Sequence, residues 1–505
     1  MIAVVSGLIS VVTGAIFTLI ITRRLEPEEF GLWSIIGSMI SYFLVTEPII
    51  SFWTTRQIAR GEKIGKTSVL TSTLFSFGSI PVYLIISLYL SDISQLHYSS
   101  VILALLLIPV SFVSQTISSI NLGHKPHASS YGLLAFESLK IPSGLILVYF
   151  LDLGINGAIL TTFIAFLAKI LVQIYLAKEQ LTNKINLDFI KHWLKHAWLP
   201  LYSNLSHLIW TLDVLIYSII TKSVLGVAYF AISSTIAAVI GQAGLISQSI
   251  YPKLLANGSH KHINENFTYL MYFAIPLLGI CIVFSKPILF ALNPAYQNIS
   301  VIVIIFSLRT FLYVVTGTFY QILMGIENID VEKNFNYKTL AKSRLFQIPT
   351  IQNIHYSVYV VSIALTAFLG NFYGYGEIEL VKWWVLIALI LQMIFLAYAS
   401  ILIRKQTTFS FPLASTVKYA LATMVFASVF YFVPNLILEY KTSIYEFLPG
   451  LLFQVSICVG IYLTITYLLD DKIKILLKSI ILASLTCASG WFSGHFNSSH
   501  RTLNA

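Results

Sequence analysis

Charged side chains are scarce in this sequence. Asp, Glu, Lys and Arg make up 10% of the 505 residues, whereas 57% of the residues are hydrophobic. Soluble globular proteins contain roughly 25% charged residues, so water is not the main solvent of this chain. The mean hydropathy of +0.82 comes from repeated apolar runs, and each run is long enough to supply the roughly 20 residues of a bilayer-spanning helix. Because these runs are continuous rather than alternating, they predict helices and not a β-barrel.

Cysteines and catalytic motifs are also rare. Cys281, Cys458 and Cys487 lie in or beside apolar runs, without short metal-type spacing, so we expect neither disulfides nor a metal site. The sequence has no HExxH, GxSxG, Walker or CxxC motif, and these motifs would carry the usual chemistry of hydrolases, ATP-driven pumps and redox proteins. We therefore expect a protein that needs no cofactor and is not an enzyme.

The apolar runs predict an all-α integral membrane protein with about fourteen transmembrane helices. The predicted spans are 2–22, 30–54, 68–90, 99–121, 131–151, 154–177, 198–220, 225–250, 267–291, 299–323, 355–374, 380–403, 414–434 and 444–469. Met1 leads directly into the first run, which ends at Arg23 and Arg24 without a small-residue cleavage site. We interpret this run as a membrane helix and not as a removed signal peptide.

The order of the spans suggests a six-plus-six arrangement followed by a pair. Residues 1–177 would form an N-lobe and 198–403 a C-lobe, joined by an amphipathic cytoplasmic link at 178–197. Residues 404–505 would add the helix pair and a basic cytoplasmic tail, in which 479–492 is expected to be interfacial. Two lobes of this kind are a common transporter architecture.

Basic residues are distributed unequally between the two sides of the predicted membrane. Of the 31 Lys and Arg residues, 21 lie in the even-numbered loops and the tail, and five lie in or near the odd-numbered loops, namely Arg23, Arg24, Lys222, Lys286 and Lys441. The positive-inside rule then predicts that both termini are cytoplasmic in a multi-pass protein of the cytoplasmic membrane. The net charge of +10 is spread over many short loops, which argues against a nucleic-acid partner. The long cytoplasmic loop 324–354 mixes basic and aromatic residues, and such segments bind the headgroups of membrane lipids.

Six ionisable side chains inside predicted spans stand out, because burying a charge there costs about 2.5 kcal/mol or more. They are Glu47, Glu137, Lys140, Lys169, Asp213 and Arg309. Glu137 and Lys140 are three residues apart and share a helix face, so they form either a structural ion pair or part of a substrate site. Lys169 lies near a helix end, where a long side chain can reach the headgroups. For Asp213 and Arg309, which lie nearer mid-span, lining of a polar cavity is favoured over a purely structural role.

The junction of the first two helices carries a recognisable motif. It reads Thr22-Arg23-Arg24-Leu25-Glu26-Pro27-Glu28-Glu29-Phe30-Gly31-Leu32-Trp33. This resembles the R-x-L-G-P-E-E-F-G-L-Y signature of the polysaccharide and O-antigen flippases in the multidrug/oligosaccharidyl-lipid/polysaccharide (MOP) exporter superfamily, with Glu26 in place of the usual Gly. A second resemblance runs from Asp213 through Gly226-Val227-Ala228-Tyr229 to Tyr251-Pro252-Lys253-Leu254, although Val214 follows the Asp where the family more often has a basic residue.

The resemblance implies a monomeric flippase that moves a polyprenyl-phosphate-linked oligosaccharide across the membrane by alternating access, for cell-surface polysaccharide synthesis. Two six-helix lobes would enclose a polar cavity, and the extra helix pair would form a groove for the lipid tail. Lys140, Arg309 and Lys169 would contact the headgroup. Glu47, Glu137 and Asp213 would balance charge or couple transport to H+ or Na+. The residues of the family motif would be Arg24, Pro27, Glu28, Glu29, Phe30 and Gly31.

Two alternatives stay open at this point. A cation-coupled exporter of drugs or organic cations, from a sister branch of the superfamily, would prefer a net acidic cavity; the six candidates divide equally between acids and bases. A membrane glycosyltransferase or polysaccharide polymerase would be expected to carry a large outward loop, and the predicted odd-numbered loops are short.

Overall fold

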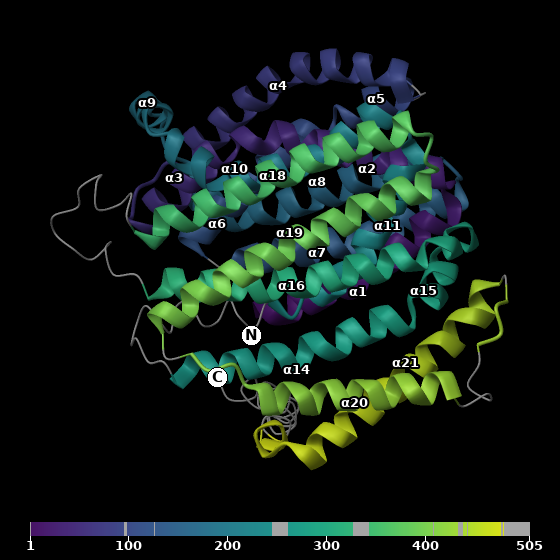
Figure 1. Ribbon diagram of the computed structural model, residues 1–505. Coiled ribbons are helices and arrows are strands. Elements are labelled where there is room, and N and C mark those ends of the chain that lie inside the picture. The colour runs from purple at the N-terminus through teal and green to yellow at the C-terminus, as the bar shows by residue number, and fades with distance from the viewer. Residues whose placement is uncertain are drawn as a thin grey trace, which may run out of the picture.

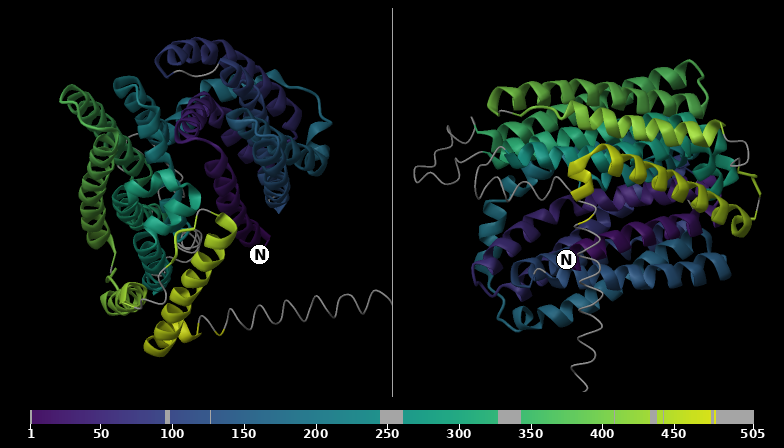
Figure 2. Two further views of the ribbon diagram at one scale, coloured as in Figure 1. Left: turned by 90° about the vertical axis from the view of Figure 1, so that its right-hand side faces the viewer. Right: turned by 90° about the horizontal axis from the view of Figure 1, so that it is seen from below.

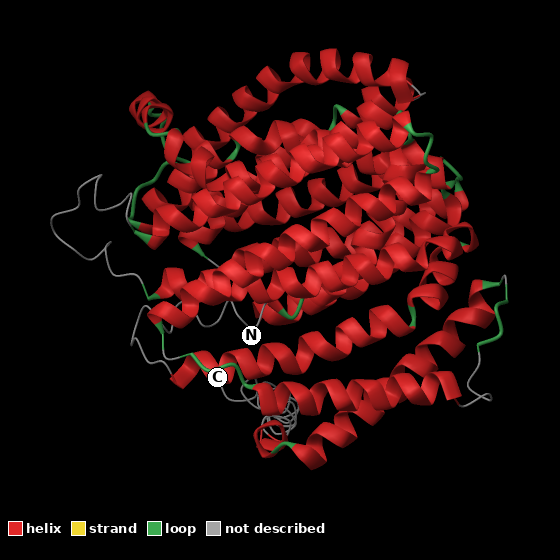
Figure 3. Ribbon diagram, viewed as in Figure 1, coloured by secondary structure: helices red, strands yellow, loops and turns green. Residues whose placement is uncertain are grey.

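The computed structural model describes residues 2–94, 98–125, 127–244, 261–326, 343–407, 409–432, 438–441, 443–475 and 478. Within these ranges the chain is helical and contains no strand (Figure 3). The elements in chain order are α1 (Ile2–Arg24), α2 (Pro27–Phe43), η1 (Leu44–Thr46), α3 (Pro48–Ala59), α4 (Gly65–Ser94), α5 (Tyr98–Ala104), α6 (Leu107–His124), α7 (His127–Gly144), η2 (Leu145–Phe150), α8 (Gly154–Leu181), α9 (Leu187–Lys195), α10 (Trp198–Thr221), α11 (Val224–Gly241), α14 (Lys261–Val283), α15 (Ser285–Leu292), η3 (Pro294–Ile299), α16 (Ser300–Gly325), α18 (Arg344–Phe372), α19 (Glu377–Gln406), α20 (Leu413–Phe432) and α21 (Ile444–Leu469).

Thirteen helices of the described residues are long and apolar enough to cross a membrane. The first predicted span forms α1, which is 23 residues long and is not one of the thirteen. The predicted all-helical, multi-pass membrane fold is therefore confirmed, with thirteen candidate spans where about fourteen were expected. The long helices run alongside one another, and α9 lies outside the bundle at one end (Figure 1).

Helices that are neighbours in sequence pack into two groups. The first helix group comprises α1 to α8, and the second comprises α10, α11, α14 to α16, α18 and α19. The left view of Figure 2 shows the purple-to-blue and teal-to-green helices side by side, with the yellow α20 and α21 at their edge. The two groups meet along α2, which packs against α10 and α11, and through α1, which packs against α15.

Several predicted spans are divided or shifted in the structure. The span 30–54 is broken at η1, because Pro48 has no amide hydrogen to continue the helix and instead starts α3. The span 99–121 is divided into α5 and α6, and the span 267–291 into α14 and α15. The prediction of a loop over 324–354 is wrong for its last part, because α18 begins at Arg344 and residues 344–354 are helical. The remainder of that loop from 327 to 342, the motif residues 251–254 and the tail segment 479–492 lie outside the described residues.

Buried tyrosines connect α21 to α14 and α20 to the end of α21. The Tyr462 hydroxyl on α21 donates to the backbone oxygen of Tyr272 on α14 at 2.6 Å. Tyr419 on α20 donates to Oδ2 of Asp470, just after α21, at 2.9 Å. Because both donors are buried, the first hydrogen bond holds α21 against α14 and the second holds α20 against the end of α21.

Candidate functional site

Glu137 and Lys140 form an ion pair on α7. Lys140 Nζ lies 3.0 Å from Glu137 Oε2, and the two side chains are 12% and 4% exposed. Glu137 also accepts hydrogen bonds from two hydroxyls of α1, Ser10 at 2.6 Å and Thr13 at 2.7 Å. Three donors therefore surround this carboxylate, which offsets the cost of burying its charge. The pair expected from the three-residue spacing is present, and α1 completes its environment.

Lys140 lines a cavity between the two helix groups. The cavity has a volume of about 430 Å³ and is bounded by α1, α7, α11, α14 and α15. Among the described residues of its mostly apolar lining, Lys140 alone is charged, and Ser10, Thr18, Thr235 and Gln242 add polar groups. The ammonium lies over the rings of Phe17 and Phe136, at 5.2 and 5.3 Å from their centroids. We call this space the lysine cavity; its single cation suits an anionic group.

Asp213 on α10 is the centre of a buried hydrogen-bond chain in the second helix group. The carboxylate is 3% exposed and accepts a 2.7 Å hydrogen bond from the hydroxyl of Tyr359 on α18. Trp384 Nε1 on α19 donates to the same hydroxyl at 3.0 Å. Asp213 also accepts from the amide of Val214. These contacts hold the carboxylate inside the bundle, where α10, α18 and α19 meet.

Arg309 on α16 lies in an aromatic cage. Its guanidinium carbon is 5.6, 5.5 and 5.7 Å from the rings of Trp210, Phe306 and Tyr313, so cation–π attraction supports the charge. The residue is 7% exposed. Within the described part of the chain its Nε makes no hydrogen bond. Arg309 is close enough to Asp213 to interact electrostatically, but it does not line the lysine cavity.

Glu47 is buried at the start of α3 and borders a second cavity between the helix groups. Its Oε1 accepts a 3.2 Å hydrogen bond from the hydroxyl of Thr116 on α6. The cavity has a volume of about 270 Å³; its walls are α2, η1, α3 and α6 from the first group and α10 from the second. We call it the polar cavity. Its polar lining residues are Ser41, Glu47, Gln115, Asn204, His207 and Thr211.

Lys169 stands apart from both cavities. It lies on α8 and is half-buried, and it forms no ion pair with any described residue. The structure therefore brings Lys140 and Glu137 together, and places Asp213 and Arg309 within electrostatic reach of each other. It does not bring Lys140, Arg309 and Lys169 into one cavity.

The motif residues form a joint between the helix groups and do not line either cavity. Pro27 occupies the first turn of α2, where its missing amide hydrogen costs nothing. The Glu26 amide donates to Glu29 Oε2 at 3.2 Å, which caps the same turn. Phe30 is buried, and a Cβ on Gly31 would lie 2.3 Å from the backbone oxygen of Val224 in α11. Glycine is therefore needed where α2 and α11 meet.

The two arginines of the motif act at the same end of the bundle. Arg24 lies over the ring of Tyr149, 4.0 Å from its centroid. Arg23 donates to the backbone oxygens of Ala291 and Phe290 at the end of α15, at 2.6 and 3.1 Å. Carbonyls at a helix C-terminus carry partial negative charge and attract cations. Arg23 therefore connects the first helix group directly to the second.

Sequence reasoning missed the hydroxyl and aromatic partners of the charged residues. These partners are uncharged residues of types that are common in membrane helices, so no motif identifies them. They are Ser10, Thr13, Thr116, Tyr359 and Trp384. A partial signal exists for Ser10 and Thr13, which lie three residues apart on one helix face and both bind Glu137.

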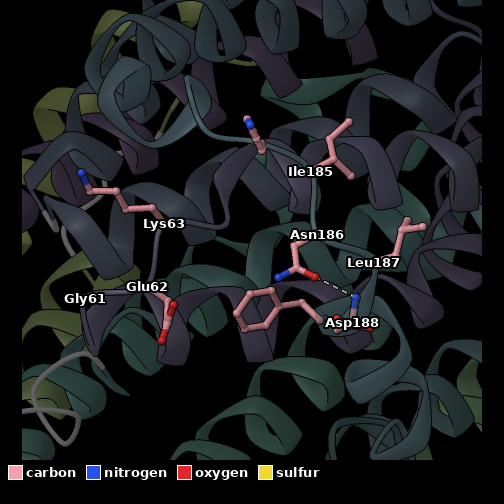
Figure 4. A pocket seen from close by; sticks show the side chains of 9 residues that line it. Gly61, Glu62, Lys63, Ile185, Asn186, Leu187 and Asp188 are labelled. Atoms are coloured by element: carbon pink, nitrogen blue, oxygen red, sulfur yellow. Dashed lines mark hydrogen bonds between the residues drawn. The ribbon is translucent and has the colours of Figure 1, made fainter.

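A third, open cup lies at the end of the bundle where α9 is found. It has a volume of about 670 Å³ and is lined by residues 61–63 and 184–189 (Figure 4). Asn186 caps α9 there, since its Oδ1 accepts from the amide of Asp188 at 2.9 Å. None of the sequence-predicted site residues lies in this cup.

Comparisons with known proteins add the fold relationship. No family model and no curated protein sequence matches the chain. Among solved structures, lipid II flippase MurJ in an inward closed conformation matches with a TM-score of 0.68 at 15% identity, covering 93% of this chain and 98% of that chain. A multidrug resistance MATE family transporter of the MOP superfamily matches in its inward-facing conformation with a TM-score of 0.58 at 14% identity, covering 79% and 96%.

The outward-facing conformation of a multidrug resistance MATE family transporter of the same superfamily gives a TM-score of 0.53 at 14% identity, covering 80% and 94% of the two chains. At these identities the likeness concerns the fold. The chain has the helical fold of MurJ and of the MATE transporters, as the resemblance of its motifs implied.

Proposed function

We propose that this protein is a flippase that carries a polyprenyl-phosphate-linked oligosaccharide from the cytoplasmic to the outer leaflet of the cytoplasmic membrane, with both termini in the cytoplasm. The observation that carries the proposal is the extent of the structural match. The MurJ structure covers 93% of the chain, whereas the MATE structures cover 79% and 80%. The difference of 13 to 14 percentage points corresponds to about 66 to 71 of the 505 residues, which is enough to include the 57 residues from Leu413 to Leu469 that contain α20 and α21.

The helix pair has a physical use in lipid transport. α20 and α21 present exposed apolar side chains, including Leu421, Phe432, Leu452 and Phe453. An apolar surface beside the second helix group offers a path along which a polyprenyl tail can stay in the hydrocarbon while its headgroup crosses. A small organic cation has no such tail and needs no such surface.

Lys140 is the proposed contact for the headgroup phosphate. It is the cation of the lysine cavity, and an ammonium in a mostly apolar wall binds phosphate more strongly than it would in water. Glu137 would balance its charge in the empty state. For Arg309 to contact the headgroup, the aromatic cage around it must open. For Lys169 to do so, α8 must turn. Asp213 and Glu47 remain proposed sites for charge balance or for coupling to H+ or Na+.

The short loops of the structure do not favour a membrane enzyme. At the end of the bundle opposite α9, α1 and α2 are separated only by Leu25 and Glu26, and α10 and α11 by Lys222 and Ser223. A glycosyltransferase or polymerase would need a larger catalytic segment on one side of the membrane. The named structural neighbours are carriers.

A reconstitution experiment tests the proposal. Purified protein in liposomes is supplied with a fluorescent polyprenyl-diphosphate oligosaccharide, and a membrane-impermeant reductant reports which leaflet the probe occupies. We expect protein-dependent flipping, a fall of at least tenfold for Lys140→Gln, and no change for Lys191→Gln. Lys191 is the matched control because it lies on α9 with its side chain 79% exposed.

A cation-coupled exporter is the second candidate function, and the likeness to the MATE transporters favours it. Three buried carboxylates, Glu47, Glu137 and Asp213, are also compatible with a cationic substrate. The same liposomes, loaded with an organic-cation dye and given a proton or sodium gradient, separate the two functions. Gradient-driven dye movement without lipid flipping would replace the flippase proposal by the exporter.

A further inference from the structure

The polar cavity differs in chemistry from the lysine cavity. It is smaller, at about 270 Å³, and its described lining residues supply a carboxylate, an imidazole, two side-chain amides and two hydroxyls but no Lys or Arg. The lysine cavity offers a cation in a mostly apolar wall. Within the described part of the chain the two cavities share no lining residue, and each suits a different kind of chemical group.

The polar side chains of this cavity are accessible although they lie in membrane-spanning helices. Ser41, Gln115 and His207 are exposed, and all three contribute to the cavity wall. Exposed polar side chains on a membrane-spanning helix are costly in hydrocarbon unless they face water or a polar ligand. Glu47 is held beside them by its hydrogen bond from Thr116, so the carboxylate position is set before a ligand enters.

The groups in the wall can both donate and accept hydrogen bonds. An amide such as Gln115 offers an acceptor oxygen and two donor hydrogens, and a hydroxyl such as that of Thr211 offers one donor and two lone pairs. A sugar hydroxyl has the same double capacity, so a polyhydroxylated ring can satisfy such a wall at many positions. The Glu47 carboxylate accepts from hydroxyls and repels acidic groups.

The size of the cavity sets the length of ligand that fits. Its volume of about 270 Å³ lies just below the roughly 300–1,000 Å³ of pockets that enclose drug-sized ligands. One sugar ring suits this space, whereas a whole oligosaccharide does not. Asn204, His207 and Thr211 come from α10, while Gln115 and Glu47 come from the first helix group. A ring bound here therefore touches both helix groups.

We propose that the polar cavity binds one neutral sugar ring of the lipid-linked headgroup and so selects glycosylated lipid over the bare lipid phosphate. This proposal rests on the flippase function, for which Lys140 contacts the phosphate. Gln115 and Thr211 are its specificity-determining residues, because both border the cavity and neither carries charge. Substituting them removes hydrogen bonds to the sugar and leaves the phosphate contact intact.

The test compares two fluorescent probes in liposomes that contain the full-length protein. One probe is a polyprenyl phosphate, and the other is the same lipid with a neutral N-acetylhexosamine oligosaccharide attached through the phosphate. Gln115→Leu and Thr211→Val are expected to slow the flipping of the glycosylated probe at least tenfold, which corresponds to about 1.4 kcal/mol, and to slow the bare probe less than twofold. Thr464→Val on α21, where the side chain is exposed, is the matched control and should change neither rate.

Each remaining outcome overturns the inference in a recognisable way. Equal slowing of both probes shows that the cavity serves the movement of the helix groups, and the flippase function then stands without the sugar site. Unchanged rates for the glycosylated probe show that no sugar binds there. If the wild-type protein flips neither probe, the proposed function falls and the inference falls with it. Unfolding temperatures of the variants confirm that each one is folded.

Discussion

The hydroxyl of Tyr359 donates a 2.7 Å hydrogen bond to Oδ2 of Asp213, across 146 positions of sequence. Tyr359 lies on α18 and Asp213 on α10, two helices that pack closely along their length. Trp384 on α19 donates to the same tyrosine oxygen. A buried hydrogen bond inside the second helix group is therefore made by two side chains that no local sequence pattern relates to each other.

Replacing Tyr359 by Phe should destabilise the protein. The substitution keeps the ring but removes the donor to a carboxylate that is 3% exposed, and an unsatisfied buried group costs about 1–3 kcal/mol. We expect a lower apparent melting temperature in detergent micelles. Tyr373→Phe is the control, because Tyr373 follows the same helix and is 68% exposed. Equal melting temperatures for the two variants would show that the hydrogen bond contributes nothing to stability.

The ion pair on α7 should be non-additive in a double-mutant cycle. Glu137→Gln alone leaves the Lys140 charge without its partner, and breaking a buried pair costs about 3–5 kcal/mol. Adding Lys140→Gln should recover more than half of that loss, as measured by the free energy of unfolding. The Asp188 and Lys191 pair has the same spacing but side chains that are 87% and 79% exposed. Its removal should be close to neutral, and additive losses at Glu137 and Lys140 would refute their coupling.

The glycine of the motif should be intolerant of a methyl group. Gly31→Ala places a Cβ 2.3 Å from the backbone oxygen of Val224, so α2 and α11 must move apart. We expect reduced stability and slower flipping of the lipid probe. Gly37 lies on the same helix and has nothing within 4 Å of an added Cβ, so Gly37→Ala should be neutral or stabilising by up to about 1 kcal/mol. A Gly31→Ala variant as active and as stable as wild type would show that the joint can relax.

The contact of Arg23 with α15 should control how easily the joint opens. Arg23→Ala removes hydrogen bonds to the carbonyls of Phe290 and Ala291. Faster hydrogen exchange is expected in α15 and in the first turn of α2, because the helix groups separate more often at that end. Arg60→Ala, at an exposed position after α3, should leave exchange in α15 unchanged. Identical exchange in the two variants would mean that other contacts close the joint.

Much of the fold follows from the order of apolar and polar residues. A run of about 20 apolar residues must form a helix in a bilayer, since no water is present there to satisfy the backbone. The breaks within spans were harder to predict. Pro48 ends a helix at η1, whereas Pro81 and Pro276 lie inside the continuous helices α4 and α14. Whether a proline interrupts a membrane helix depends on the neighbours that replace the missing hydrogen bond.

The candidate site was predictable only as single residues. The cost of burying charge identified Glu47, Glu137, Lys140, Asp213 and Arg309, and only the Glu137–Lys140 contact follows from spacing. The cavities are formed by residues far apart in the sequence. Lys140 faces Thr235 and Gln242 across the lysine cavity.

The sequence by itself determined that this chain spans a membrane many times and that a few ionisable groups lie deep inside it, because both properties depend on local composition and on the cost of moving charge into hydrocarbon. Only the tertiary structure decided which of those groups meet. In the structure, Lys140 lines the lysine cavity, Arg309 is enclosed by aromatic rings, and Glu47 borders the polar cavity. These arrangements depend on how separate helices pack, and helix packing is set by side-chain shape across distant segments and not by the order of residues within one helix.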